Sequence, residues 1–264
     1  MSDALKRLKD LDREMRTIHQ IRSLGEWDMH TYMPERGVQA RSEQSAYLAG
    51  LAHEKQTNPE IGDLLDKLGA SDENPMGSAE LSDRDRRLVR AAYRDFHQST
   101  RLPGSLIQEI ARVTSVAQSV WAEARKKSDF SLFKPHLEKI VDLNLQVAEA
   151  LGYQDHPYDA LPDQYEPGIR TKEVASVFRQ LREALVPLVR RIKEAKQIDD
   201  GVMHKHYPAH LQEQFSNKLL DAMGYDRARG RLDVSAHPFT IPLAGLDVRI
   251  TTRFQEDFLP SALF

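Results

Sequence analysis

The sequence predicts a mainly α fold, a multi-helix array with a small antiparallel β hairpin near the carboxyl end. Over about two thirds of the chain, apolar residues recur at steps of three and four, which is the period of amphipathic helices. The period changes to two in residues 231–235 and 247–253, as in half-buried strands. With 264 residues, 40% of them hydrophobic, the chain can bury a core without crosslinks. We see no linker that divides it and expect residues 1–264 to form a single helical region.

Four helices are expected in the first part of the chain, over residues 3–29, 35–56, 59–68 and 82–99. Pro34 marks the start of the second, because proline fits the first turn of a helix, where its missing donor is not needed. Ser82 precedes the fourth, with Asp85 at the position where a capping box prefers Glu or Gln. Residues 69–79 combine Ser, Asp, Asn, Pro and Gly, which indicates a surface loop.

Two long helices follow, and the short turn between them predicts an antiparallel pair. The first is entered through Pro103, and the second follows Ser128 and Asp129 and ends at Gly152, a natural left-handed cap. Their apolar stripes comprise Leu106, Ile107, Ile110, Val113, Ala117, Val120, Trp121 and Ala124 in the first helix, and Leu137, Ile140, Val141, Leu145, Ala148 and Leu151 in the second.

A further helix is expected to begin after Thr171 as its N-cap. Pro187 lies inside it and predicts a bend near residues 183–187 rather than two separate helices. The side that we expect to be buried carries Val174, Val177, Phe178, Leu181, Leu185, Leu188, Val189 and Ile192.

The two alternating segments near the carboxyl end are expected to pair as a hairpin through the Pro- and Gly-containing connector between them. In the second segment Val248 and Ile250 would face the core, and Asp247, Arg249 and Thr251 would share the other face. That polar row would point into a cleft or into solvent.

Composition excludes several classes of function. The 37 basic and 40 acidic residues are interspersed and give a formal charge of −3, so nothing favours a nucleic-acid partner. The absence of cysteine excludes disulfides and thiolate chemistry and leaves His, Asp and Glu as metal ligands. The amino terminus is charged and lacks an apolar signal region, and no apolar run is long enough to span a membrane. We therefore expect a cytoplasmic, soluble protein.

Two clusters are candidate metal sites. His204, His206 and His210 lie close in sequence, but Pro208 prevents the two last imidazoles from sharing a helix unless that helix begins near the proline. His156, Asp159 and Asp163 follow a long helix, where such residues more often cap backbone amides of turns. The pair His53-Glu54 begins like a zinc-protease motif, but the position four residues after His53 is Thr57, so the match fails.

Arg249 and Asp247 admit two interpretations. An arginine on the polar face of a strand can hold a carboxylate through two parallel hydrogen bonds, with Asp247 orienting or neutralising it. The alternative is a cross-strand ion pair at the sheet surface, worth a few tenths of a kcal/mol. Residue types alone do not decide between them.

Segments along nearly the whole chain resemble the carboxypeptidase Taq family, peptidase family M32, of zinc metallocarboxypeptidases. Two signatures are the most specific: His237-Pro238-Phe239, and an Asp-x-Arg-x-x-Thr pattern at Asp247, Arg249 and Thr252. The resemblance implies that these six residues lie beside the substrate groove. It is carried by residues 27–34, 40–44, 51–55, 126–130, 156–160, 165–168, 230–234, 237–239 and 247–253.

The resemblance also implies proteolysis: removal of single amino acids from peptide carboxyl ends, with zinc held by a His-Glu-x-x-His helix and a downstream Glu. This sequence contains no His-Glu-x-x-His. We therefore expect it to correspond to the N-terminal half of a family member, with the metal-binding half absent, no catalytic residue and no metal ligand of its own, and no activity alone. The expected partners are peptide substrate and either a second copy or a complementing C-terminal half.

Two other interpretations stay open. In one, the chain is a non-catalytic helical binding or assembly module. In the other, the least favoured, it carries an independent metal site at one of the two clusters. An exposed apolar patch is expected from Phe254, Phe258, Leu259, Leu263 and Phe264, covered either by a polypeptide that carries the missing half or by self-association.

Overall fold

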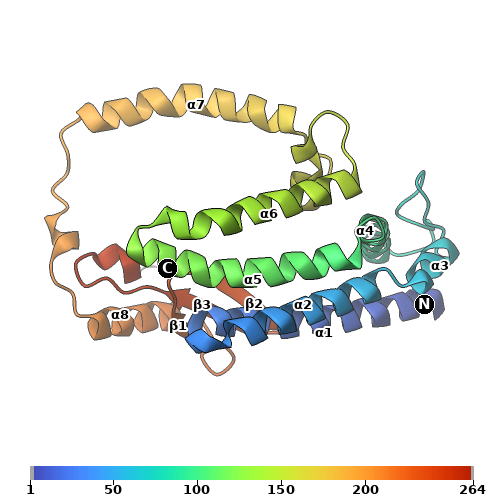
Figure 1. Ribbon diagram of the computed structural model, residues 1–264, viewed down its shortest axis with the longest axis horizontal. Coiled ribbons are helices and arrows are strands. Elements are labelled where there is room, and N and C mark those ends of the chain that lie inside the picture. Colours follow the sequence, from blue (N-terminus) through green and yellow to red (C-terminus); the bar gives the residue numbers. More distant parts are fainter. Residues whose placement is uncertain (1–2, 263–264) are drawn as a thin grey trace. The chain divides into compact units, whose positions relative to one another are not determined.

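The computed structural model describes residues 3–262 and divides the chain into two compact units (Figure 1). The N-terminal unit comprises residues up to 29 together with 33–153, and the C-terminal unit comprises residues 30–32 together with 154 onward. The expected array of helices with a small sheet near the carboxyl end is confirmed. No helix within residues 3–262 is long and apolar enough to span a membrane.

The N-terminal unit is helical, and the expected helices are all present. Its elements are α1 (Asp3–Thr31), whose last residues belong to the C-terminal unit, then the 3₁₀ turn η1 (Glu35–Gly37), α2 (Val38–Gln56), α3 (Pro59–Lys67), α4 (Asp83–Ser99), α5 (Gly104–Lys127) and α6 (Phe130–Leu151). The Asn58 side chain caps α3 by accepting from the Glu60 amide at 2.9 Å, and the Ser82 hydroxyl caps α4 by accepting from the Asp85 amide at 3.2 Å.

A hydrophobic core joins α1, α3 and α4. Residues three apart on α1 meet α3 residues of matching spacing, and Val89 of α4 is fully buried between them. The cluster contains Leu5, Leu8, Leu11, Ile61, Leu64, Leu65, Leu68, Ala70 and Val89.

The antiparallel pair α5–α6 is confirmed, and the two helices lie side by side in Figure 1. Ser128 adopts the left-handed conformation that ends α5, and the Asp129 carboxylate accepts from the Ser131 amide at 3.0 Å to start α6. The predicted stripe of α6 is wrong in part, because Leu137, Val141 and Leu145 are exposed. Ala148 and Leu151 of the predicted stripe are buried, together with Leu143 and Val147, which the stripe did not include.

The C-terminal unit contains one more long helix and the sheet. Its elements are the 3₁₀ turns η2 (Pro157–Ala160) and η3 (Pro162–Gln164), α7 (Thr171–Glu194), η4 (Gly201–His204), α8 (Ala209–Ala222), the strands β1 (Arg231–Val234), β2 (Thr240–Ala244) and β3 (Asp247–Thr252), and η5 (Leu259–Ala262). As expected, α7 is one helix with Pro187 inside it, but its N-cap is Arg170, and Thr171, the predicted N-cap, is its first residue.

The sheet has the order β1-β3-β2, with β2 antiparallel and β1 parallel to β3. An antiparallel hairpin is therefore present, but the predicted pairing of residues 231–235 with 247–253 as its two strands is wrong. The connector itself forms β2 and takes the antiparallel position, so β1 pairs with the other edge of β3. Pro242 fits in β2 because this is an edge strand, where a missing backbone donor costs no sheet hydrogen bond.

The prediction that α7 buries its apolar side is also wrong, because none of its residues is buried. Phe178 is 63% exposed and Leu181 is 48% exposed. Periodicity identified the apolar side of this helix but not whether anything in the chain covers it. The predicted carboxyl-terminal patch is smaller: Phe258 is exposed, Phe254 and Leu259 are half-buried, and Leu263 and Phe264 lie outside the described residues.

Gly77, in the predicted surface loop, should tolerate no side chain. Its φ is +69°, and an added Cβ would lie 2.6 Å from the Leu68 carbonyl oxygen. We expect Gly77→Ala to lower the free energy of unfolding by about 3 kcal/mol or more, because left-handed strain and a backbone collision add together. Gly224→Ala is the matched control: its φ is +75°, but nothing lies within 4 Å of an added Cβ, so only the backbone strain of about 1–2 kcal/mol applies. Equal losses in denaturant unfolding would show that the Leu68 carbonyl places no restriction on residue 77.

Candidate functional site

The candidate site is built on one face of the three-stranded sheet. The parallel register sets Arg231 beside Arg249 and Asp233 beside Thr251. Residues paired in register point to the same side of a sheet, as do alternate residues of one strand. Arg231, Asp233, Asp247, Arg249 and Thr251 therefore share one face, which we call the polar sheet face.

Arg249 and Asp247 form a bidentate ion pair on this face. Arg249 Nε donates to Asp247 Oδ1 at 2.6 Å, and Nη2 donates to Oδ2 at 2.8 Å. The two side chains are 18% and 30% exposed. The hydrogen bonds from Arg249 hold the pKa of Asp247 below its ordinary value, so the carboxylate is ionised at neutral pH. The pair lies within one strand, two residues apart, rather than across strands.

A second pair of the same chemistry lies on the neighbouring strand. Arg231 Nε and Nη2 donate to the two oxygens of Asp233 at 2.8 and 2.7 Å. The Tyr32 hydroxyl donates to Asp233 Oδ1 at 2.6 Å and accepts from Arg231 Nη2 at 2.8 Å, and the guanidinium also stacks over the Tyr32 ring at 5.2 Å. The hydrogen bond to Asp233 raises the pKa of Tyr32. Tyr32 is thereby fixed to β1.

Two buried hydroxyls hold the turn that contains His237, Pro238 and Phe239. Thr251 Oγ1 accepts from the Phe239 amide at 2.8 Å, and the Thr251 amide donates to the Phe239 carbonyl at 2.8 Å. The Ser235 hydroxyl lies 2.8 Å from both the His237 carbonyl and Thr251 Oγ1. The Phe239 ring packs against that of His30, with centroids 4.9 Å apart. The turn is therefore fixed to β3 through both side chains and backbone.

The structure brings together five of the six residues expected beside a substrate groove. Asp247 and Arg249 pair directly, and the 237–239 turn is fixed to the same strand through Thr251. Thr252 is different: strand alternation turns it to the opposite face, where it is fully buried and its hydroxyl donates to the Ser261 carbonyl at 3.4 Å. Thr251 does lie on the polar sheet face, but it is 1% exposed, so at this position the expected polar row opens into neither a cleft nor solvent.

Sequence reasoning missed the partners that complete this face, namely Tyr32, Asp233, Ser235 and the structural role of Arg231. The two motifs have opposite order, Arg-x-Asp in β1 and Asp-x-Arg in β3, and together they indicate two ion pairs on one face once parallel pairing of the strands is considered. No sequence signal indicated Tyr32, because it lies 201 positions before Asp233.

The candidate metal clusters are used in turns and caps. His156 Nδ1 accepts from the Tyr158 amide, Asp159 accepts from the Thr171 amide at 2.7 Å and Asp163 accepts from the Gly168 amide at 2.7 Å. The His204 ring packs against Phe258, and α8 begins just after Pro208. Within residues 3–262 no group of three His, Asp or Glu side chains is placed to hold a metal ion.

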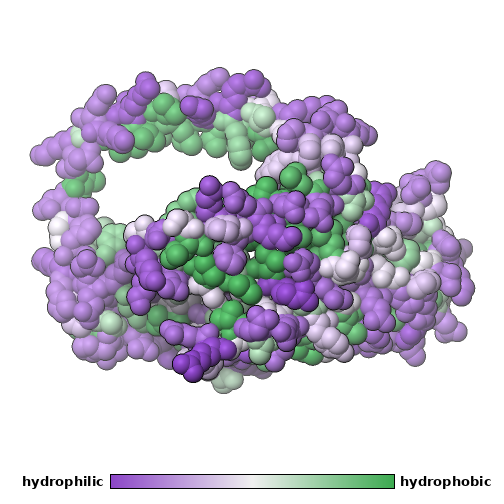
Figure 2. Space-filling model, in the orientation of Figure 1, coloured by the Kyte–Doolittle hydropathy of each residue, from purple (hydrophilic) through white to green (hydrophobic). Residues whose placement is uncertain are grey.

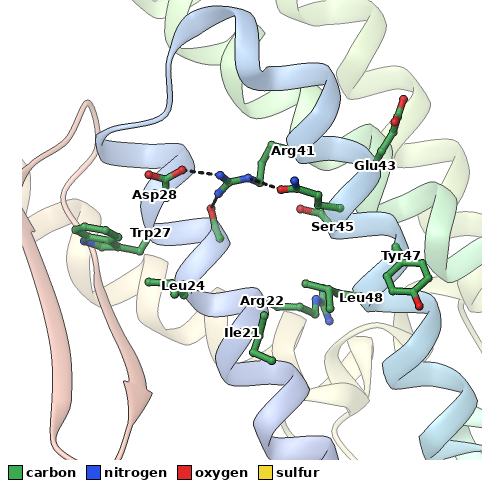
Figure 3. Close-up of a pocket in the computed structure, with 12 residues that line it drawn as sticks. Ile21, Arg22, Leu24, Trp27, Asp28, Arg41, Glu43, Ser45, Tyr47 and Leu48 are labelled. Atoms are coloured by element: carbon green, nitrogen blue, oxygen red, sulfur yellow. Dashed lines mark hydrogen bonds and ion pairs between the residues drawn. The ribbon is translucent and has the colours of Figure 1, made fainter.

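A separate groove of about 850 Å³ lies between α1 and α2 in the N-terminal unit (Figure 3). Its apolar lining includes Ile21, Leu24 and Leu48. Arg41 crosses from α2 to α1, where it donates to the Gly25 carbonyl and to Asp28, each at 2.7 Å. The groove is concave and mainly apolar. The guanidinium of Arg41 already donates to these partners within the protein.

The Thr251 hydroxyl should be more important than its methyl group. Thr251→Val keeps the shape but removes the acceptor of the Phe239 amide, and a buried donor without a partner costs about 1–3 kcal/mol. We expect that loss in the free energy of unfolding, with faster hydrogen exchange at the Phe239 amide. Thr251→Ser keeps the hydroxyl and should retain slow exchange. Equal exchange in the two variants would show that the hydroxyl does not hold the turn.

Sequence comparison matches residues 7–264 to the carboxypeptidase Taq (M32) metallopeptidase family. Thermostable carboxypeptidase 1 of Thermus thermophilus is 37% identical, over 99% of this chain and 52% of the relative. Carboxypeptidase 1 of Bacillus subtilis is 33% identical, over 99% of this chain and 50% of the relative. The chain thus spans about half the length of the curated relatives it matches.

Solved structures agree. The crystal structure of BsuCP superposes with a TM-score of 0.91 at 32% identity, over 99% of this chain and 52% of that chain. A Pyrococcus furiosus carboxypeptidase structure superposes with a TM-score of 0.82 at 34% identity, over 100% of this chain and 52% of that chain. The M32 carboxypeptidase from Deinococcus radiodurans superposes with a TM-score of 0.82 at 32% identity, over 99% of this chain and 51% of that chain. Since the match extends over almost all 264 residues in both sequence and fold, the chain belongs to the carboxypeptidase Taq (M32) family of metallopeptidases.

Proposed function

We propose that this chain supplies the scaffold and a substrate-binding wall of a zinc metallocarboxypeptidase that removes amino acids from peptide carboxyl ends. The observation that carries the proposal is the polar sheet face, where the bidentate Arg249–Asp247 pair lies beside a turn fixed by Thr251. A guanidinium of this kind recognises a carboxylate, and the terminal carboxylate distinguishes the end of a peptide from its interior.

The residues present do not fit a zinc ion. The sequence has no His-Glu-x-x-His, and the His, Asp and Glu side chains of residues 3–262 form no group able to hold a metal. We therefore assign the zinc ligands and the general base to sequence that these 264 residues do not include. The chain's own part is to bind and orient: Arg249 binds the terminal carboxylate, and the His237–Phe239 turn borders it.

The apolar side of α7 supports a protein partner. Figure 2 shows hydrophobic residues along one side of this helix and hydrophilic residues along the other. An exposed apolar stripe of this length indicates an interaction surface. It is formed by Val177, Phe178, Leu181, Leu185, Leu188, Val189 and Ile192, all exposed. Since the relatives are about twice as long as this chain, we propose that the polypeptide corresponding to their remaining half covers this stripe.

A cytoplasmic location is part of the proposal, and its support is the absence of cysteine from the 264 residues, which fits a reducing compartment.

Hydrolysis should require the remaining half. We expect the chain alone to release no carboxyl-terminal amino acids from peptides, with or without added zinc. A chimera that joins it to the remaining half of the Bacillus subtilis relative should be active. In that chimera Arg249→Ala should lower kcat/KM about 10- to 100-fold, because charge-assisted hydrogen bonds to the substrate carboxylate are lost.

Two outcomes contradict the proposal. Zinc-dependent activity of the chain alone would show that it carries its own hydrolytic site. A folded, zinc-loaded chimera without activity would instead favour the alternative function, a non-catalytic helical binding or assembly module.

The α7 stripe should be required for binding the remaining half. Leu181→Asp places a charge on the apolar side and should weaken association of the two co-expressed polypeptides at least about tenfold, measured by sedimentation or calorimetry. Arg190→Asp introduces the same residue on the polar side and serves as the matched control. If both variants associate as tightly as the unmodified chain, the stripe is not the interface, and if the chain alone forms a dimer that Leu181→Asp dissociates, the occupant is a second copy.

A further inference from the structure

The two Arg–Asp pairs of the polar sheet face have the same chemistry but differ in how firmly the carboxylate is held. Asp233 is 2% exposed and receives hydrogen bonds from Arg231 Nε, Arg231 Nη2 and the Tyr32 hydroxyl. Asp247 is 30% exposed, and within the described part of the chain its hydrogen bonds come from Arg249.

This difference decides which carboxylate can leave its arginine. Separating Asp233 from Arg231 would leave a buried charge without its counter-ion, which costs several kcal/mol. Asp247 can turn into water and be solvated there, because almost a third of its side chain is already exposed. The first pair is therefore permanent, and the second can exchange.

Asp247 also occupies Arg249 in the way that a ligand carboxylate would. Its two oxygens lie 2.6 and 2.8 Å from Nε and Nη2, which is the parallel two-bond geometry of guanidinium–carboxylate recognition. A free carboxylate that approaches Arg249 therefore meets an ion pair that is already neutral and must compete with a carboxylate tethered two residues away.

We propose that Asp247 is an internal competitor for Arg249, a specificity-determining residue that a terminal carboxylate has to displace before it binds. This inference rests on the proposed function, which makes Arg249 the carboxylate-binding residue. Ligands without a free carboxylate cannot displace Asp247. Binding of the correct end of a peptide is thus coupled to release of this side chain, and the resting site is closed to weak anions.

The test is direct binding to the chain itself, with N-acetyl-phenylalanine as the carboxylate ligand and its amide as the neutral analogue. Asp247→Asn removes the competing charge, so we expect the acid to bind about tenfold more tightly than to the unmodified chain, while the amide is unchanged. Calorimetry or ligand-detected NMR gives both affinities. Asp247→Ala should show the same gain and serves if the asparagine variant does not fold.

Asp233→Asn is the matched control, because it removes the same charge from the permanent pair and should give no gain. Adding Arg249→Gln to Asp247→Asn should abolish the gain. Acid binding that is unchanged or weaker in both Asp247 variants would overturn the proposal and make Asp247 an orienting residue. These are binding experiments, so their failure is distinguishable from failure of the proposed function, which the chimera's hydrolysis tests.

Discussion

The polar sheet face depends on one constraint, that two arginines are paired in register on neighbouring parallel strands. The register pairs Arg231 with Arg249, and adjacent strands are only about 4.8 Å apart. Positive charges on register-paired residues of adjacent strands repel, and the arrangement is tolerable because each strand supplies its own carboxylate two residues away, on the same face. Asp247 raises the pKa of Arg249 against the opposing effect of Arg231, so the attraction prevails over the repulsion.

Several neighbours in the C-terminal unit hold these ion pairs and the adjacent turn in place. Tyr32 supplies Asp233 with a third donor, and His30, two residues earlier in the chain, packs on Phe239. Thr251, next to Asp233 in the register, fixes the 237–239 turn with its hydroxyl and its backbone. The residues that resemble family signatures are thus positioned by neighbours outside the signatures, and a substitution at Tyr32 or Ser235 can disturb the site without touching a substrate.

Much of the fold could be predicted from sequence because the residues that begin and end its helices act locally. Ser82 before α4, Asp129 before α6 and Gly152 after α6 act within one turn of helix, so residue types alone locate them. Contacts between distant elements could not be predicted in the same way. Alternation identified β1 and β3 as strands but is the same in parallel and antiparallel pairs, so it could not reveal that the connector would form β2.

The candidate site shows the same division. Spacing placed Asp247 and Arg249 on one face, and the structure pairs them. Strand alternation should also have separated Thr252 from them, but the signature grouped these residues by order in sequence rather than by side of the strand. Tyr32 became a partner only through folding. For α7, the apolar stripe was correctly located but its exposure was not predicted. Periodicity shows which side of a helix is apolar and does not show what, if anything, packs against it.

The charge balance can be measured by a double-mutant cycle on Asp233 and Asp247. If each carboxylate neutralises one of two adjacent guanidinium groups, Asp233→Asn with Asp247→Asn should destabilise the chain by about 0.5–1 kcal/mol more than the sum of the single variants. That excess should shrink as salt is added, because the unbalanced arginines are screened from each other. Additive losses of unfolding free energy at low salt would contradict this account, since they would mean that the two ion pairs are energetically independent of each other.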